Sequence, residues 1–159
     1  MESILNKNIL VVDDDERLLR ALAKVLTNEG AVITGASWAG EAMEQLADLQ
    51  KRFDLIITDL QMPFVRGPTI LRMIAQCFQG EADRPVPVVE GKVTTQVLPK
   101  VPVIVLTAFG SPEVKAECLR QGAAAFLEKP LDTTQLLAAI GDVFASQNGG
   151  HVNHLAGAK

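Results

Sequence analysis

Apolar and polar positions follow two alternating patterns along the chain. Short β-branched runs are each followed by a longer segment in which apolar residues recur every three or four positions. The first pattern predicts buried strands and the second predicts amphipathic helices. The predicted strands are 8–13, 31–36, 53–59, 101–107 and 123–128. Five successive βα units predict a doubly wound α/β fold, with a parallel sheet, right-handed crossovers and helices on both faces.

The predicted helices lie between these strands, and their ends carry typical boundary residues. The helices are 16–29, one after Ser37, one around 70–78, one after Ser111 and one after Asp132. A hydroxyl or carboxylate at these starting positions can cap the first free amides of a helix. Gly30 and Gly122 predict helix ends.

Two stretches fall outside this alternation. Residues 81–100 separate the third helix from the fourth strand, whereas such connections usually have ~2 to 6 residues. They form either an irregular excursion or a hairpin of 86–90 with 92–97, and the sequence leaves both open. The folded domain is therefore expected to be 1–146, interrupted by this insertion. Residues 147–159 are Gly-rich and lack periodicity, so we expect a disordered tail, with His151 and His154 solvated rather than bound to metal.

Composition narrows the class of protein. A chain of 159 residues with 48% hydrophobic content fits a single domain. The net charge of -4 and the lack of a basic run argue against direct binding to nucleic acid. Cys77 and Cys118 have no CxxC spacing, which favours buried free thiols in a reducing compartment. With no signal sequence and no apolar stretch of ~18 residues, we expect a cytoplasmic protein without a membrane partner.

Chemically active side chains gather at the predicted strand ends. In an open parallel sheet, ligands bind outside the carboxyl ends of the strands. The residues at these ends are Asp13, Asp14, Asp15, Asp59, Thr107 and Lys129. Each alone is more simply a helix cap, a turn residue or a solvated charge, but their convergence on one edge predicts a site.

The charges of this cluster indicate a metal and a phosphoryl group. Two carboxylates ~4 Å apart repel each other by about 4 kcal/mol at an effective dielectric constant near 20, so a cation is needed. Oxygen ligands in this number suit Mg²⁺, which commonly shares its coordination with a phosphate oxygen. No Gly-rich nucleotide-binding loop is present. Asp59 is therefore the best candidate for a nucleophile that accepts the phosphoryl group, and Asp13 and Asp14 are the candidate metal ligands.

Four motifs in this order carry a family resemblance. They are VVDD, LIITDLQMP followed by Gly67, VIVLTA and AFLEKP. Together, in register with five βα units, they resemble the receiver domain of response regulators in bacterial two-component systems, from about Asn8 to Ser146. The resemblance implies a flavodoxin-like, five-stranded parallel sheet in the order 2-1-3-4-5, with the insertion between helix 3 and strand 4.

The resemblance also implies a role for each matching residue. Asp59 would be the phosphoacceptor, and Mg²⁺ or Mn²⁺ would be bound by Asp13, Asp14, Asp59 and the backbone carbonyl of Gln61. The phosphoryl oxygens would be bound by Thr107, the amide of Ala108 and Lys129. Asp15 and Glu16 would instead cap the first helix.

Further positions would carry the response to phosphorylation. Thr107 and Phe126 match the switch pair of the family, although Phe126 could also be a simple core aromatic. Pro63, Gly67 and Pro130 match loop positions, and the Lys129-Pro130 bond is often cis in relatives. Gln61 and Phe109 lie where relatives tune the attacking water. A bulky Phe109 predicts slow loss of the phosphoryl group.

The expected function is a phosphorylation switch. A sensor histidine kinase or a phosphotransfer protein would supply the phosphoryl group. The surface of the fourth helix, fifth strand and fifth helix would then bind an unknown protein or a second copy of the chain. The chain would catalyse only its own phosphorylation and slow dephosphorylation. The alternatives are a receiver-like module that is never phosphorylated and, with less support, an aspartyl-phosphate phosphohydrolase. The latter usually has a general acid two residues after its nucleophile, where this chain has Gln61.

Overall fold

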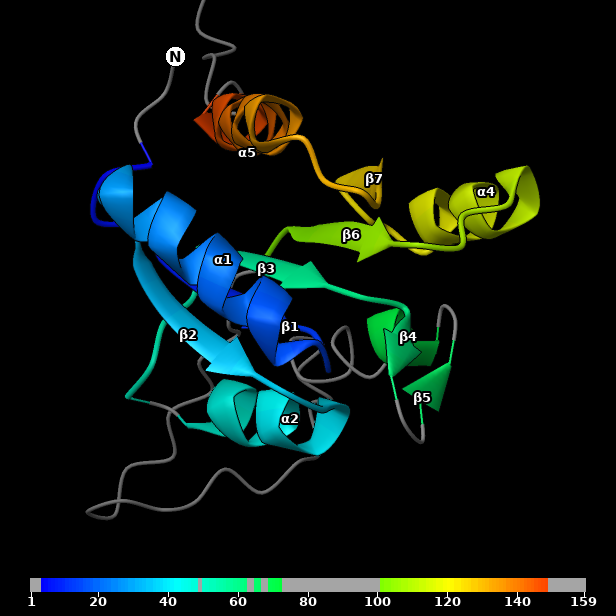
Figure 1. The fold of residues 1–159 in the computed structure, drawn as a ribbon, viewed down its shortest axis with the longest axis horizontal. Helices are drawn as coiled ribbons and strands as arrows, with labels where there is room; N and C mark the ends of the chain where they lie inside the picture. The colour runs from blue at the N-terminus through cyan, green and yellow to red at the C-terminus, as the bar shows by residue number, and fades with distance from the viewer. Residues whose placement is uncertain (1–3, 49, 63–64, 67–68, 73–100, 149–159) are drawn as a thin grey trace, which may run out of the picture.

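The computed structural model describes residues 4–48, 50–62, 65–66, 69–72 and 101–148. Within these ranges the main sheet has five parallel strands in the order β2-β1-β3-β6-β7 (Figure 1). Their bounds are β1 Asn8–Val12, β2 Val32–Ala36, β3 Leu55–Thr58, β6 Val103–Thr107 and β7 Ala125–Glu128. Taken by position along the chain, this is the expected order 2-1-3-4-5.

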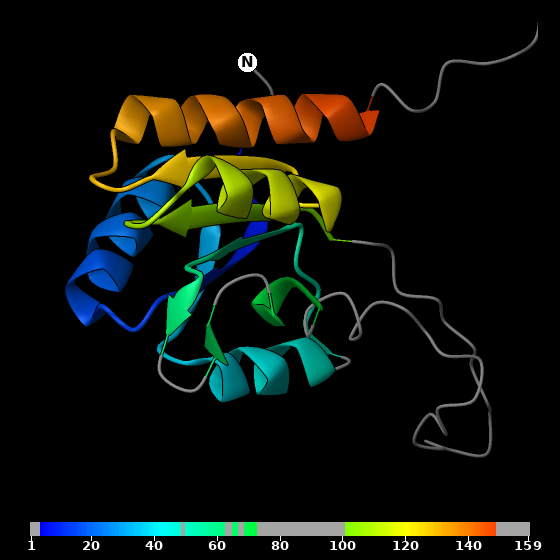
Figure 2. The same cartoon turned by 90° about the vertical axis from the view of Figure 1, so that its right-hand side faces the viewer.

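Helices cover both faces of the sheet. Their bounds are α1 Glu16–Asn28, α2 Ala39–Ala47, α4 Pro112–Arg120 and α5 Thr133–Asn148, and residues 69–72 are also helical. Figure 2 shows the sheet between α5 on one side and α2 on the other. The doubly wound α/β architecture predicted from the sequence is confirmed.

Successive strand residues face opposite core layers. Along β1, Leu10 and Val12 pack with α2 and α4 residues, whereas Ile9 and Val11 pack with α1 and α5 residues. β3 and β6 alternate in the same way, which accounts for their nearly continuous apolar sequences. The sheet is therefore packed between two apolar layers, one on each face.

The pairing registers align the strand ends that carry the polar residues. Val12 is opposite both Ala36 of β2 and Thr58 of β3, and Thr107 is opposite Glu128 of β7. The residues that follow these positions consequently meet along one edge. Asp13 and Asp59 each follow one of these aligned positions.

Most predicted helix boundaries are observed. Ser111 is the N-cap of α4, its Oγ accepts a hydrogen bond from the amide of Val114, and Pro112 is the first helical residue. Gly30 and Gly122 follow α1 and α4 with φ angles of 91° and 96°, which glycine adopts readily. Asp132 accepts a hydrogen bond from the amide of Thr134 at the start of α5.

The prediction that Ser37 caps the second helix is wrong. Trp38 is the N-cap of α2 and makes no side-chain capping bond. The amide and hydroxyl of Ser37 instead donate to Oε2 of Glu41, at 2.7 and 3.0 Å. Glu41 lies in the first turn of α2, and its carboxylate takes up both donors of Ser37.

Two other local features differ from expectation. α5 runs to Asn148, two residues into the segment expected to be a disordered tail. Gln61–Met62 (β4) pairs antiparallel with Val65–Arg66 (β5), where only a loop was expected after the third strand.

Several predictions concern residues outside the described ranges. They are the possible hairpin at 81–100, the loop residues Pro63 and Gly67, the thiol of Cys77, and His151 and His154. Cys118, which is described, is a buried free cysteine as predicted. None of the helices in the described ranges has both the length and the hydropathy needed to cross a bilayer.

Candidate functional site

Three carboxylates meet at the carboxyl edge of the sheet. Asp13, Asp14 and Asp59 each offer an oxygen, and these atoms lie within 4.8 Å of one another. Asp13 and Asp59 are buried, with 2% and 6% exposure, while Asp14 is exposed. The cluster predicted from strand ends is therefore formed, and it has one open side.

The sheet itself positions the two buried acids. The amide of Asp13 donates to the carbonyl of Ala36 at 3.0 Å, and the amide of Asp59 donates to the carbonyl of Val12 at 2.9 Å. Both bonds continue the strand pairing by one residue past the strand ends. The backbone at both acids is therefore held by the sheet before any side chain contributes.

Each buried carboxylate also accepts a backbone amide from two residues further on. Oδ1 of Asp13 accepts from the amide of Asp15 at 2.9 Å, and Oδ1 of Asp59 accepts from the amide of Gln61 at 3.0 Å. The sequence reasoning missed these bonds, although aspartate after a strand is the usual residue for such a turn. They orient both side chains so that Oδ2 remains available.

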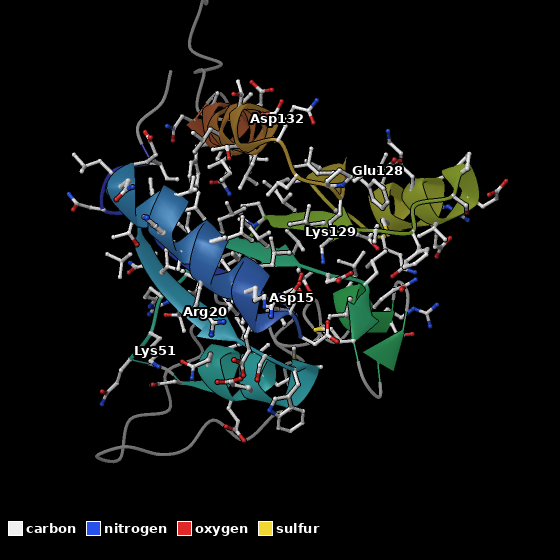
Figure 3. All side chains as sticks on the ribbon, viewed as in Figure 1. Asp15, Arg20, Lys51, Glu128, Lys129 and Asp132 are labelled. Carbon is white, nitrogen blue, oxygen red and sulfur yellow. The ribbon has the colours of Figure 1, made fainter. Side chains whose placement is uncertain are left out.

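Lys129 joins the two buried carboxylates. Its Nζ donates to Oδ2 of Asp13 at 2.6 Å and to Oδ2 of Asp59 at 2.8 Å. Its backbone amide donates to the carbonyl of Thr107 at 2.9 Å, which fixes where the side chain starts. Asp15, Glu128 and Lys129 are labelled in Figure 3, near the ends of β1 and β7.

The proton affinities of this cluster follow from burial and pairing. Burial raises the pKa of the Asp13 carboxyl above its ordinary value, although the hydrogen bonds from Lys129 and from the amide of Asp15 oppose this. Burial acts to lower the pKa of Lys129, but the hydrogen bonds to Asp13 and Asp59 outweigh it and the pKa is raised. Lys129 is therefore a firmly charged cation beside a carboxyl group that burial disfavours as an anion.

The end of β6 brings a hydroxyl and a loop to the same edge. Thr107 is fully buried, and its Oγ accepts a hydrogen bond of 3.4 Å from the amide of Phe109. Ala108 and Phe109 are exposed, and Phe109 has a relative exposure of 68%. Phe109 therefore follows the end of β6 as an exposed aromatic residue.

The remaining predicted residues lie around this edge. The Lys129-Pro130 peptide bond is cis, as the resemblance implies. Gln61 is exposed and begins β4, and Phe126 on β7 is half-buried against the α2 and α4 side of the core. Nothing in the described residues tests the roles assigned to them, and those roles remain predictions.

The donor set fits a hard divalent cation. Three carboxylates within reach of one point are ligands that Mg²⁺ accepts, and the exposure of Asp14 leaves room for water or a phosphoryl oxygen. The carboxylates of Asp13 and Asp59 form ion pairs with Lys129. A divalent cation here would share these carboxylates with the lysine.

The sequence as a whole decides the family. Residues 9–141 match the response regulator receiver domain. The chain belongs to this family. Receiver domains act in two-component signalling, where they receive phosphoryl groups from histidine kinases. The family assignment expected from the four motifs is therefore confirmed.

Relatives of known sequence show the receiver in different contexts. This chain is 33% identical over 135 residues to the transcriptional regulatory protein GlrR of Escherichia coli K12. The matched region covers 85% of this chain and 26% of GlrR. It is 30% identical over 141 residues to a 14.6 kDa protein of Leptolyngbya boryana, covering 88% of this chain and 92% of that one. The receiver thus spans about a quarter of GlrR but nearly all of the Leptolyngbya protein.

Solved structures show the same fold. The signal receiver domain of an HD domain-containing protein from Pseudomonas fluorescens Pf-5 superposes with a TM-score of 0.70 at 26% identity, covering 91% of this chain and 98% of that one. The CheX-CheY-BeF₃-Mg²⁺ complex from Borrelia burgdorferi contains a chain with a TM-score of 0.69 at 26% identity, covering 88% and 90%. The flavodoxin-like fold predicted for this receiver is confirmed.

Proposed function

We propose that Asp59 accepts a phosphoryl group from a phosphohistidine of a sensor histidine kinase or phosphotransfer protein. The observation that carries this proposal is the bridge of Lys129 between Asp13 and Asp59 beside the exposed Asp14. A carboxylate oxygen of Asp59 attacks phosphorus, the bond from phosphorus to the histidine nitrogen breaks, and that nitrogen keeps the electron pair. The product is an aspartyl phosphate on this chain.

Each neighbouring group has a part in this transfer. Asp13, Asp14, Asp59 and the backbone carbonyl of Gln61 would hold Mg²⁺, or Mn²⁺ in its place. The bound cation supplies positive charge to the phosphoryl oxygens. Lys129 reaches Asp59 already and needs little movement to pair with a phosphoryl oxygen. The hydroxyl of Thr107 and the amide of Ala108 would donate to the remaining oxygens.

The outcome of phosphorylation is a change in binding surface. Thr107 and Phe126 would form the switch, and α4, β7 and α5 would present the altered surface to a downstream protein or to a second copy of the chain. The chain acts as a switch and has no reaction beyond its own phosphorylation and slow dephosphorylation. Gln61 and Phe109 would set the rate of dephosphorylation.

Acetyl phosphate with Mg²⁺ tests the proposal, with intact mass as the measurement. We expect the mass of one phosphoryl group to be added to the wild type and not to Asp59→Asn. Asp54→Asn is the matched control, because Asp54 lies just before β3, at the end of the strand opposite to Asp59, and its carboxylate accepts a hydrogen bond from the amide of Asn8. This variant should be phosphorylated like the wild type.

Three results would contradict the proposal. Phosphorylation that survives Asp59→Asn would place the acceptor elsewhere. An absence of any adduct, with beryllofluoride also failing to bind, would indicate an interaction module that is never phosphorylated. Repeated turnover of a phosphate ester would indicate a phosphohydrolase.

A further inference from the structure

β2 forms one edge of the main sheet, and one side of its backbone faces away from β1. The sheet order places β1 beside β2 and no strand of the described residues on the other side. The amide of Val32 and the carbonyl of Ala36 both bond to residues that flank β1. Backbone groups along a strand point alternately to its two sides, so those of Ile33 and Gly35 point away from β1. These two residues therefore offer hydrogen-bond donors and acceptors along the edge.

The sequence of β2 lacks the residues that usually protect an exposed edge. Proteins commonly place a lysine, another charged residue or a proline on an edge strand. Val32–Ala36 reads VITGA and contains none of these. The opposite edge of the sheet differs, because β7 ends in the exposed Glu128. The β2 edge is therefore the better template for pairing with a further strand.

Gly35 is a glycine that the fold of a single chain does not require. Its φ angle is not positive, and within 4 Å its Cβ would meet Cδ1 of Leu19 alone, at 4.0 Å. Glycine inside a strand weakens that strand and often marks a place where another backbone approaches closely. Gly35 is exposed, so such an approach comes from outside the chain.

Large apolar side chains are exposed near both ends of β2. In the described part of the chain five such residues are exposed, and three of them are Leu5, Val32 and Trp38, at 58%, 54% and 50%. Val32 begins β2, and Trp38 follows its last residue by two positions. Leu5 lies against Gly30, two positions before β2. Exposed apolar surface gathered in one region is typical of a protein interface.

We propose that two copies of this chain associate by antiparallel pairing of their β2 strands. A twofold axis at Thr34 places Ile33 of one copy opposite Gly35 of the other, so that each amide donates to the facing carbonyl. The side chains of directly opposed residues lie on the same face of a sheet. Gly35 has no side chain there, which leaves room for the side chain of Ile33.

The same register joins the exposed apolar ends of the strand. Position 38 of one copy is opposite position 30 of the other, so Trp38 approaches the Leu5 that lies against Gly30. The twofold symmetry forms this contact twice. β2 and β7 lie at opposite edges of the sheet (Figure 1). The pairing is therefore separate from the surface proposed to change on phosphorylation, and it does not depend on a phosphoryl group at Asp59.

Cysteine cross-linking tests the register of the two strands. In Thr34→Cys the two thiols face each other across the axis, with Cα atoms ~4.5 Å apart, a separation that suits a disulfide. In Val32→Cys the Cα atoms are four strand positions apart, roughly 13 Å, which is too far. Val32→Cys is the matched control, because Val32 is on the same strand and is more exposed than Thr34. Copper phenanthroline should cross-link Thr34→Cys at least about tenfold faster than Val32→Cys, and equal rates would overturn the proposal.

Sedimentation equilibrium of the whole chain measures the association itself. We expect a Kd in the micromolar range or weaker, because two short strands bury less area than a standard interface. Gly35→Lys should raise this Kd at least about tenfold, since the lysine fills the space for Ile33 and brings charge to the edge. Ala116→Lys adds the same charge to the exposed surface of α4 and should leave the Kd unchanged. Asp59→Asn should dimerise like the wild type.

Tryptophan emission gives a readout that needs no variant. Trp38 is the single tryptophan of the chain, so a blue shift of the emission at rising protein concentration reports its burial in the dimer. The wild-type emission and the cross-linking stay informative even if Gly35→Lys fails to fold. A chain that stays monomeric up to about 1 mM would overturn the proposal. A dimer that is weakened by Ala116→Lys and not by Gly35→Lys would place the interface on α4 and overturn it as well.

Discussion

The ammonium group of Lys129 donates a hydrogen bond of 2.8 Å to Oδ2 of Asp59, although 70 positions separate the two residues in the chain. The same group donates to Oδ2 of Asp13 at 2.6 Å. One lysine therefore donates to two buried carboxylates. A divalent cation that enters the cluster must compete with this lysine or share the carboxylates with it.

Replacing Lys129 by methionine should destabilise the protein chiefly in the absence of metal. Asp13 and Asp59 would lose their cation while both stay buried, so we expect the free energy of unfolding in EDTA to fall by about 3 kcal/mol. Mg²⁺ should recover part of this loss and stabilise the variant more than the wild type, because the ion replaces the missing charge. Urea unfolding in EDTA and in MgCl₂ measures both effects.

Lys115→Met is the control for this experiment. Lys115 is an exposed residue of α4. Its replacement should therefore change the free energy of unfolding by no more than about 0.5 kcal/mol, both in EDTA and in MgCl₂. An equal loss of stability for Lys129→Met with and without Mg²⁺ would contradict the proposed competition.

Asp14 and Asp15 should respond differently to replacement by alanine. Asp15 is the N-cap of α1, and its side chain accepts from the amides of Arg17 and Leu18. Asp15→Ala should therefore lower the free energy of unfolding by about 1 kcal/mol and leave Mg²⁺-dependent phosphorylation intact. Asp14→Ala should abolish that phosphorylation with little effect on stability. Thermal unfolding and the acetyl phosphate assay distinguish them, and an equal loss of phosphorylation in both variants would refute the assignment.

The raised pKa of Asp13 predicts a pH dependence of stability in EDTA. Burial makes the folded state hold this proton more tightly than the unfolded chain does. The contribution of Asp13 to stability should then fall as the pH rises from about 3.9, the ordinary value for aspartate, through its raised value in the folded protein. Asp13→Asn cannot ionise and escapes this loss. Its stability relative to the wild type should increase between pH 3 and pH 7, and a relative decrease would be the contrary result.

Phe109 should lengthen the life of the phosphoryl group on Asp59. Phe109 is exposed and its amide bonds to the hydroxyl of Thr107, so we expect its apolar ring to restrict the approach of water to the acyl phosphate. We expect a lifetime well beyond seconds for the wild type and a loss of phosphoryl group about threefold faster in Phe109→Ala. Intact mass followed over time measures both rates. Leu119→Ala, which alters an exposed apolar residue on α4, should leave the rate unchanged.

Local patterns were enough to predict the elements of the main sheet. The capping hydroxyl of Ser111, the proline after it and the glycines at 30 and 122 act within one helical turn, so their effects are readable from neighbouring residues. The short apolar runs likewise depend on burial of one segment between two layers. These signals predicted the order of the elements. They also placed Asp13, Asp59 and Lys129 at the same edge of the predicted sheet.

The start of α2 and the short strands after β3 were not predicted correctly from local patterns. Ser37 was expected to cap α2, but the helix begins one residue later with Trp38 as its N-cap, and the amide and hydroxyl of Ser37 donate to Glu41. The pairing of β4 with β5 was not foreseen, because strands of two residues carry too little pattern to be recognised.

The sequence alone determined the fold class, the family and the identity of the acids at the strand ends, since each follows from periodicity or from motifs a few residues long. Only the tertiary structure decided that Lys129 bridges Asp13 and Asp59, and that the side chain of Leu5 lies against Gly30. Those contacts join residues from different strands and loops. Their distances depend on strand register and on side-chain packing, which no local stretch of sequence specifies.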